Sequence, residues 1–156
     1  MSYFIRLIFL ILFIRTLTIL FIGKIPCMEN LYWMLGNEII NDNVETINLV
    51  PLYSIALFLL DQIFNNLFLT SSLIFIFSST VISIFIYLIC DNFYDKKTAK
   101  IALILSLFYP SISVSIAGYS HTVIFTTVFE IIALYFLLIF LKNQKLNLFI
   151  PVILFS

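Results

Sequence analysis

The chain is poor in the residues that build polar surfaces, tight turns and metal sites. Only 10% of its 156 residues are charged, whereas 63% are hydrophobic and the mean hydropathy is +1.17. It contains three Gly, four Pro, two Cys and one His. A water-soluble domain needs a polar surface, so this composition excludes a soluble fold. The shortage of glycine argues against a Gly-rich phosphate loop, and the single histidine argues against a zinc site.

The chain also has no excess of positive or negative charge. Eight Lys and Arg residues balance eight Asp and Glu residues, which gives a net charge of zero. A nucleic-acid-binding protein would carry a basic excess, so we expect membrane lipids, another membrane subunit or small molecules as partners. The two cysteines, Cys27 and Cys90, are predicted to lie at opposite sides of the membrane, too far apart to form a disulfide.

Most of the sequence consists of long apolar segments. A helix needs about 20 apolar residues to cross the bilayer, and four runs meet this length if the third is allowed to be short. A fifth run, 146–156, is too short to cross, so we expect a fragment, a truncated product or a final segment in the interface. The prediction is one all-α domain over 1–156, a multi-pass transmembrane helical bundle with spans at 3–23, 66–90, 101–117 and 122–141.

The positions of the basic residues predict the orientation of these spans. Short cytoplasmic loops collect Lys and Arg, and one side of the predicted topology holds most of them. This side contains Arg6, Lys96, Lys97, Lys100, Lys142 and Lys145. The N-terminus is therefore predicted to be cytoplasmic, the loop 24–65 to be non-cytoplasmic, and the first span to be an uncleaved signal anchor.

Two further helices are predicted on the outer surface. The apolar run 51–64 is short and contains Asp61, and counting it as a span would move the loop with three lysines outside. We therefore expect it to lie on the outer leaflet, with Pro51 in its first turn. A preceding set of apolar residues at helical spacing predicts a short amphipathic helix: Met28, Leu31, Tyr32, Leu35 and Ile39.

Two charges fall inside predicted spans, and each is costly there unless paired or hydrated. Arg15 lies in the first span and Glu130 in the fourth. Either they pair with each other or reach toward the interface, or they serve a lipid-phosphate or substrate site; both interpretations stay open.

Two residues outside the spans are further candidates. Glu29 begins the amphipathic helix, where it could act as a general base, although favourable charge at the helix start is the simpler interpretation. His121, in the outer turn 118–122, could bind a phosphate or simply be solvated. The aromatic residues of the outer segments are interpreted as interfacial anchors: Tyr32, Trp33 and Tyr53.

The order of these elements resembles the N-terminal part of the GT-C glycosyltransferases. The closest likeness is to the group of dolichyl-phosphate-mannose protein mannosyltransferases and aminoarabinose transferases. The stretch 108–142 also looks like part of the GPI-anchor mannosyltransferases. The residues that carry the resemblance are Arg15, Glu29-Asn-Leu-Tyr32, Val50-Pro-Leu-Tyr53, Asp91-Asn-Phe-Tyr-Asp-Lys-Lys97 and Phe108-Tyr-Pro110.

The resemblance implies an integral-membrane enzyme that moves a sugar from a polyprenyl-phosphate donor to an acceptor on the non-cytoplasmic side. It implies Glu29 as the catalytic base, with Arg15 and His121 as substrate-binding residues; no cofactor is expected, and a divalent metal is left open. The family usually has Asp in the first outer loop where this chain has Met28-Glu29, and often Glu at the position of His121.

Family members are also several times longer than 156 residues. The alternative is a small non-enzymatic multi-pass membrane protein, either an accessory subunit or a degenerate gene product. A transporter is a third, less supported option, because only Pro110 and Glu130 point that way.

Overall fold

The computed structural model describes residues 3–22, 29–41, 51–107 and 122–143. Within these ranges every regular element is an α-helix, which confirms the all-α prediction. The helices are α1 (Tyr3–Ile22), α2 (Glu29–Ile40), α3 (Pro51–Phe64), α4 (Leu67–Phe93), α5 (Lys96–Leu107) and α7 (Thr122–Asn143).

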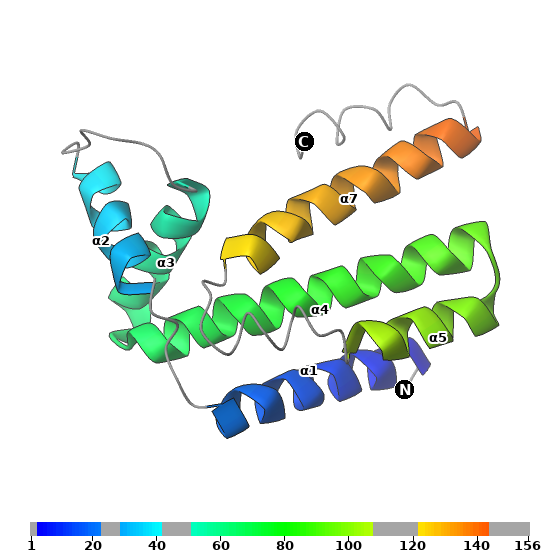
Figure 1. Ribbon diagram of the computed structural model, residues 1–156, viewed down its shortest axis with the longest axis horizontal. Helices are drawn as coiled ribbons and strands as arrows, with labels where there is room; N and C mark the ends of the chain where they lie inside the picture. Colours follow the sequence, from blue (N-terminus) through cyan, green and yellow to red (C-terminus); the bar gives the residue numbers. More distant parts are fainter. Residues whose placement is uncertain (1–2, 23–28, 42–50, 108–121, 144–156) are drawn as a thin grey trace.

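Helix α4 is the centre of the arrangement. In Figure 1, α7 lies along one side of it, and α1 and α5 lie along the other. The main apolar core joins three of these helices around α4: it contains Ile19 of α1, Phe75 and Ile82 of α4, and Ile124 and Val128 of α7. Apolar side chains that point inward from three directions therefore hold the bundle around α4.

Small polar residues let the neighbouring helices approach α4 closely. Ser79, Thr80 and Ser83 are buried, and their hydroxyls donate to backbone carbonyls one turn earlier in the same helix. Such residues are typical of contacts between helices in membranes, since they are small and satisfy their own polar atoms. The helix begins after Asn66, whose side chain accepts a hydrogen bond from the Leu69 amide at 3.0 Å.

Two described helices are long and apolar enough to cross a membrane. They are α4 and the segment Thr122–Lys142 of α7, close to the predicted spans 66–90 and 122–141. The predicted span 3–23 corresponds to α1, in which the described apolar stretch is Ile8–Leu17. The predicted span 101–117 is described only as far as Leu107, and the segment 146–156 lies outside the described residues.

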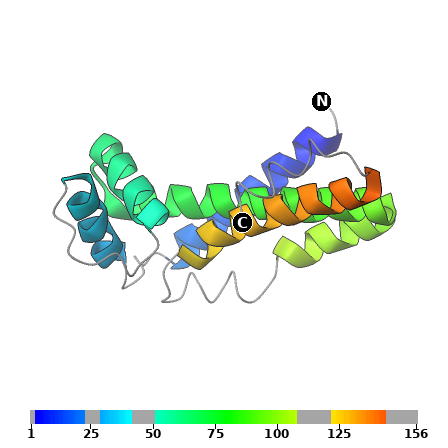
Figure 2. The same ribbon diagram turned by 90° about the horizontal axis from the view of Figure 1, so that it is seen from above.

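Helices α2 and α3 form a packed pair at one end of α4 (Figures 1 and 2). Their backbones meet at Gly36. A Cβ atom there would collide with the carbonyl oxygen of Ser54 and lie 2.8 Å from the Cβ of Phe58. Only glycine allows this contact, so Gly36 determines how closely the two helices approach.

The apolar residues of the predicted amphipathic helix lie on more than one side of α2. Tyr32 and Leu35 are buried together with Glu29, because this face turns toward α3 and α4. Leu31 is 45% exposed on the outer side. Met28 lies outside the described residues.

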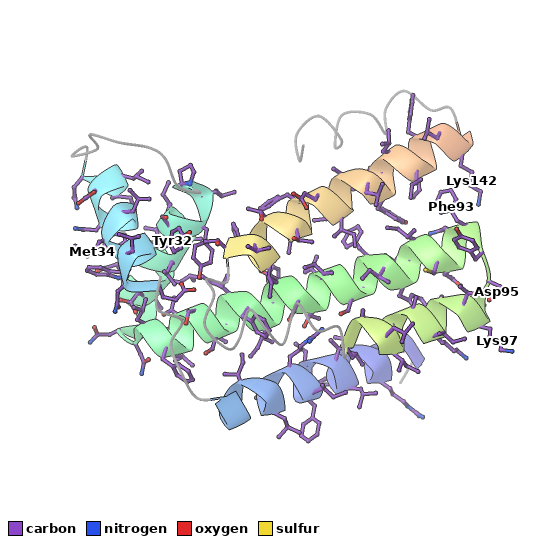
Figure 3. The ribbon with its side chains drawn as sticks, in the orientation of Figure 1. Tyr32, Met34, Phe93, Asp95, Lys97 and Lys142 are labelled. Atoms are coloured by element: carbon purple, nitrogen blue, oxygen red, sulfur yellow. The ribbon has the colours of Figure 1, made fainter. Side chains whose placement is uncertain are left out.

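The opposite end of the bundle carries the basic residues. Figure 3 shows Phe93, Asp95, Lys97 and Lys142 together at this end, far from Tyr32 and Met34. The Lys142 ammonium donates to the backbone oxygen of Asn92 at 2.8 Å and lies 5.3 Å from the centre of the Phe93 ring. Lys142 therefore caps the end of α4 and fastens α7 to it.

Candidate functional site

The described part of the chain brings Glu29 and Tyr53 into direct contact. Glu29 is the first residue of α2 and Tyr53 lies in the first turn of α3; both side chains are fully buried. The Tyr53 hydroxyl donates a hydrogen bond to Oε2 of the Glu29 carboxylate. This bond joins the starts of the two short helices.

The surroundings of this pair keep the tyrosine protonated. Burial raises the pKa of the Tyr53 hydroxyl, and the negative charge and hydrogen bond of Glu29 raise it further. Tyr53 is therefore a neutral donor, and the carboxylate accepts its proton in a hydrogen bond. The position of Glu29 in the first turn of α2 also favours a negative charge, because the helix dipole is positive there.

A row of aromatic rings connects the pair to α7. Tyr32 meets Tyr53 edge-on with 5.4 Å between ring centres, Tyr53 meets Phe125 at 5.5 Å, and Phe125 meets Phe129 at 5.3 Å. Phe125 and Phe129 belong to the first two turns of α7. The α2–α3 pair and the start of α7 therefore border the same buried region.

This arrangement corrects the sequence interpretation of two aromatic residues. Tyr32 is 6% exposed and Tyr53 is 0% exposed, so neither is an interfacial anchor. Their rings fill the space among α2, α3 and α7 instead. Trp33 is half-buried and packs against Phe58, with 5.5 Å between ring centres.

Arg15 has a different environment, at the end of α5. Its side chain is 2% exposed, and its two terminal nitrogens donate to the backbone oxygens of Ser106 and Leu107 at 3.0 and 3.3 Å. These are the last two described residues of α5. The guanidinium therefore fastens α1 to α5 through two backbone oxygens.

The ion pair between Arg15 and Glu130 that the sequence left open is not formed. Glu130 is exposed on α7, and α7 and α1 lie on opposite sides of α4 (Figure 1). The hydrogen bonds of Arg15 also do not involve Glu29. The sequence-predicted candidates Arg15 and Glu29 therefore belong to two separate polar clusters of the molecule.

Within the described ranges, three buried side-chain atoms have no hydrogen-bond partner: Nε of Arg15, Nε1 of Trp33 and Oγ of Ser78. The Ser106 hydroxyl extends the cluster around Arg15 toward α4, since it lies 3.2 Å from the Ser83 hydroxyl and donates to it. A polar layer thus runs through the interface of α1, α4 and α5.

His121 lies outside the described residues, directly before Thr122, the buried first residue of α7. Among the described residues, no group of three His, Cys, Asp or Glu side chains could hold a metal ion. Cys90 is a free, half-buried thiol, and Cys27 is outside the described residues.

Sequence reasoning missed Tyr53 as the partner of Glu29. The signal was present in the segment Val50-Pro-Leu-Tyr53, which contributed to the resemblance, but no spacing rule connects it to Glu29. No protein-family model matches the chain, and neither does any curated protein or solved structure. The order of the helices and the contact between Glu29 and Tyr53 are therefore the features of this chain that bear on its function.

Proposed function

We propose that the chain is the N-terminal part, or a remnant, of a GT-C-type integral-membrane glycosyltransferase. Its reaction moves a sugar from a polyprenyl-phosphate donor to an acceptor on the non-cytoplasmic side. The observation that carries the proposal is the buried Glu29 carboxylate at the first turn of α2, held by Tyr53 from the Pro-Leu-Tyr turn of α3. Both residues lie in segments on which the resemblance to this family depends.

The order of the helices supports the same proposal. An apolar helix with a buried arginine comes first, then two short packed helices, and then the long apolar α4. A short turn with Asp95 follows α4 and leads into α5, which begins with Lys96 and Lys97. This is the order of elements that resembles the transferase family.

The proposed chemistry is a direct displacement at the anomeric carbon of the sugar. Glu29 accepts the proton of an acceptor hydroxyl while the hydroxyl oxygen forms a bond to the anomeric carbon. The bond between this carbon and the lipid phosphate breaks, and the phosphate leaves with the electron pair, which inverts the configuration. Tyr53 orients the carboxylate, because its neutral hydroxyl donates to one carboxylate oxygen.

Arg15 and His121 are the proposed substrate-binding residues. Nε of Arg15 is the atom that a phosphate oxygen would meet, since the terminal nitrogens already bond to α5. His121 precedes α7, whose first turns border the region of Glu29.

The membrane placement forms part of the proposal. We place α1, α4, α7 and the segment 101–117 across the bilayer, with the basic end in the cytoplasm and the loop 24–65 outside. Helices α2 and α3 lie in the outer interface. A stripe of exposed apolar residues on α3 would contact lipid there, formed by Leu52 (53% exposed), Leu59 (50%) and Ile63 (73%).

The binding of a donor tests this proposal. Purified full-length chain in lipid nanodiscs should bind a radiolabelled polyprenyl-phosphate sugar saturably, and unlabelled lipid should compete. Arg15→Leu should weaken binding at least tenfold, whereas Arg6→Leu, at an exposed position of the same helix, should leave it unchanged. A lack of saturable binding by the unmodified chain would contradict the proposal.

One observation favours a second candidate, a non-enzymatic multi-pass membrane protein. Glu29 is 0% exposed, so an acceptor hydroxyl reaches it only if α2 or α3 moves. In a non-enzymatic protein the Glu29–Tyr53 bond would simply hold α2 against α3. Under this alternative the chain binds no sugar donor, and Glu29→Gln changes only stability.

A further inference from the structure

Helix α5 has a buried face and a continuous exposed face. The buried face consists of four residues that point into the bundle: Ala99, Leu103, Ser106 and Leu107. The exposed face consists of Lys97, Thr98, Lys100, Ile101, Ile104 and Leu105. At 100° per residue, these six positions fall within an arc of about 160° around the helix axis, and no buried or half-buried residue of α5 lies within it.

Charged and apolar side chains occupy different ends of this face. Lys97 and Lys100 lie in its first part, next to the exposed Lys96. Large apolar side chains follow them: Ile101 (50% exposed), Ile104 (54%) and Leu105 (65%). Lys97 and Leu105 are about 12 Å apart along the helix axis, and the hydrocarbon of one leaflet is about 15 Å thick. The face therefore has the order of a phospholipid, with a charged part first and an apolar part of matching length behind it.

The end of the bundle where α5 begins has an excess of positive charge. Its acidic side chains among the described residues are Asp91, which is half-buried, and Asp95, which accepts a hydrogen bond from the Thr98 amide at 2.6 Å. Figure 3 shows Asp95 and Lys97 at this end, and α1 begins there as well (Figure 1). The cations of the described residues outnumber the two carboxylates: Arg6, Lys96, Lys97, Lys100 and Lys142. This end therefore complements an anion.

The surroundings of the lysines distinguish between possible anions. Tyr94 is 75% exposed directly before α5, and tyrosines gather at the level of lipid headgroups. The positive end of the α5 dipole lies at the same place. A soluble anion would contact the lysines but leave the apolar residues uncovered. A zwitterionic lipid would cover the apolar residues but bring no net charge to the lysines, so an anionic lipid matches both parts of the face.

We propose that the exposed face of α5 binds an anionic glycerophospholipid of the cytoplasmic leaflet. Lys96 and Lys97 bind the phosphate of its headgroup, and its acyl chains lie along Ile101, Ile104 and Leu105 toward the centre of the bilayer. The inference rests on the proposed membrane placement, with the basic end in the cytoplasm. It does not depend on sugar transfer.

Photolabelling with two lipid probes tests this inference. The full chain is reconstituted in nanodiscs that contain a trace of phosphatidylglycerol or phosphatidylcholine, both with the same diazirine-bearing acyl chains. The phosphatidylglycerol probe should label residues 101–105 at least fivefold more than the phosphatidylcholine probe, because only its headgroup has a net negative charge. Phe77, which is 68% exposed on α4, is the matched control and should be labelled equally by both probes.

Variants of the two lysines test the headgroup contact. Lys96→Gln combined with Lys97→Gln should reduce the preference to less than twofold while circular dichroism shows unchanged helix content. Lys96→Arg combined with Lys97→Arg should keep the preference, because both charges remain. Equal labelling by the two probes, or a preference that the Gln variant retains, would overturn the inference. Loss of the preference in millimolar glycerol 3-phosphate at constant ionic strength would also overturn it, because the lysines would then bind a soluble anion.

Separate measurements distinguish this inference from the proposed function. A chain that binds the polyprenyl-phosphate sugar but labels equally with both lipid probes would overturn the lipid site alone. A chain that labels as expected but binds no sugar donor would leave the lipid site standing and contradict the transferase. A chain that does not enter the nanodisc bilayer would overturn both.

Discussion

Two charged side chains, Glu29 and Arg15, are buried in a protein in which only 10% of the residues are charged. Each is held by hydrogen bonds to another helix: Glu29 accepts from Tyr53 of α3, and Arg15 donates to the end of α5. Buried charges are stable only when such partners satisfy them. Both residues therefore connect chain segments that lie far apart in the sequence.

Tyr53→Phe tests the contact at the start of α2 and α3. The variant keeps the ring and its aromatic contacts but removes the donor to Glu29, so we expect the free energy of unfolding to fall by about 1.5–3 kcal/mol. Unfolding in mixed micelles of increasing denaturant content measures the change. The control is Tyr32→Phe, in the other ring of the same pair, which should change the free energy of unfolding by less than about 0.5 kcal/mol. Equal losses in the two variants would show that the Tyr53 hydroxyl does not stabilise this contact.

Among the elements, α2 and α3 depend most on one position. Gly36 lies where a Cβ atom would meet the Ser54 carbonyl, which cannot move without shifting α3. The same pair bears Glu29 and Tyr53, so the spacing of α2 and α3 also determines the geometry of the candidate site.

Gly36→Ala should separate the two helices. The added methyl group forces α2 away from α3, and we expect a loss of stability of about 1–3 kcal/mol, as in other overpacked interfaces. Met34→Ala, at a position of α2 that is 55% exposed, is the control and should cost little. A Gly36→Ala protein as stable as the unmodified chain would show that α2 and α3 are not packed as described.

The start of α5 should respond to pH. Asp95 accepts a hydrogen bond from the Thr98 amide at 2.6 Å, and this bond lowers the pKa of its carboxyl group. Because the folded pKa is below the unfolded value, the cap stabilises the protein above the unfolded pKa. Its contribution is lost as the pH falls through the folded pKa.

Asp95→Ala should therefore lower the melting temperature by more at pH 7 than at a pH well below about 3.9, where the Asp95 carboxyl is protonated. The Asn side chain can cap α5 but does not titrate. Asp95→Asn should therefore be more stable than Asp95→Ala by the same amount at both pH values. A difference between the unmodified chain and Asp95→Ala that does not vary with pH would contradict this account.

For the molecule as a whole, sequence reasoning predicted the helices better than their contacts. Apolar runs at 51–64, 66–90 and 122–141 were enough to locate α3, α4 and α7. The second span was predicted to end at Cys90, whereas α4 extends to Phe93 with Lys142 at its end. Contacts such as Glu29 with Tyr53 were not predictable, because they depend on how α2 and α3 pack.

The charge distribution along the molecule predicts its orientation. Helix α3 and Lys97 lie at opposite ends of α4 (Figures 1 and 3), and Lys97 and Ile63 of α3 are both exposed. A membrane-impermeant maleimide applied from outside should label Ile63→Cys but not Lys97→Cys in a background where Cys27 and Cys90 are replaced by Ser. Labelling of Lys97→Cys alone would reverse the proposed topology.

The proposed role of Glu29 as the base of a glycosyl transfer is measured in the transfer reaction itself. The native product is assayed in its own membranes with a radiolabelled polyprenyl-phosphate sugar. Glu29→Gln keeps the acceptor for the Tyr53 hydrogen bond but cannot take a proton. It should reduce transfer by 10²–10⁴-fold at unchanged expression, a range typical of a lost general base. The exposed control Glu38→Gln, on the same helix, should retain activity. Full transfer by Glu29→Gln would contradict the claim.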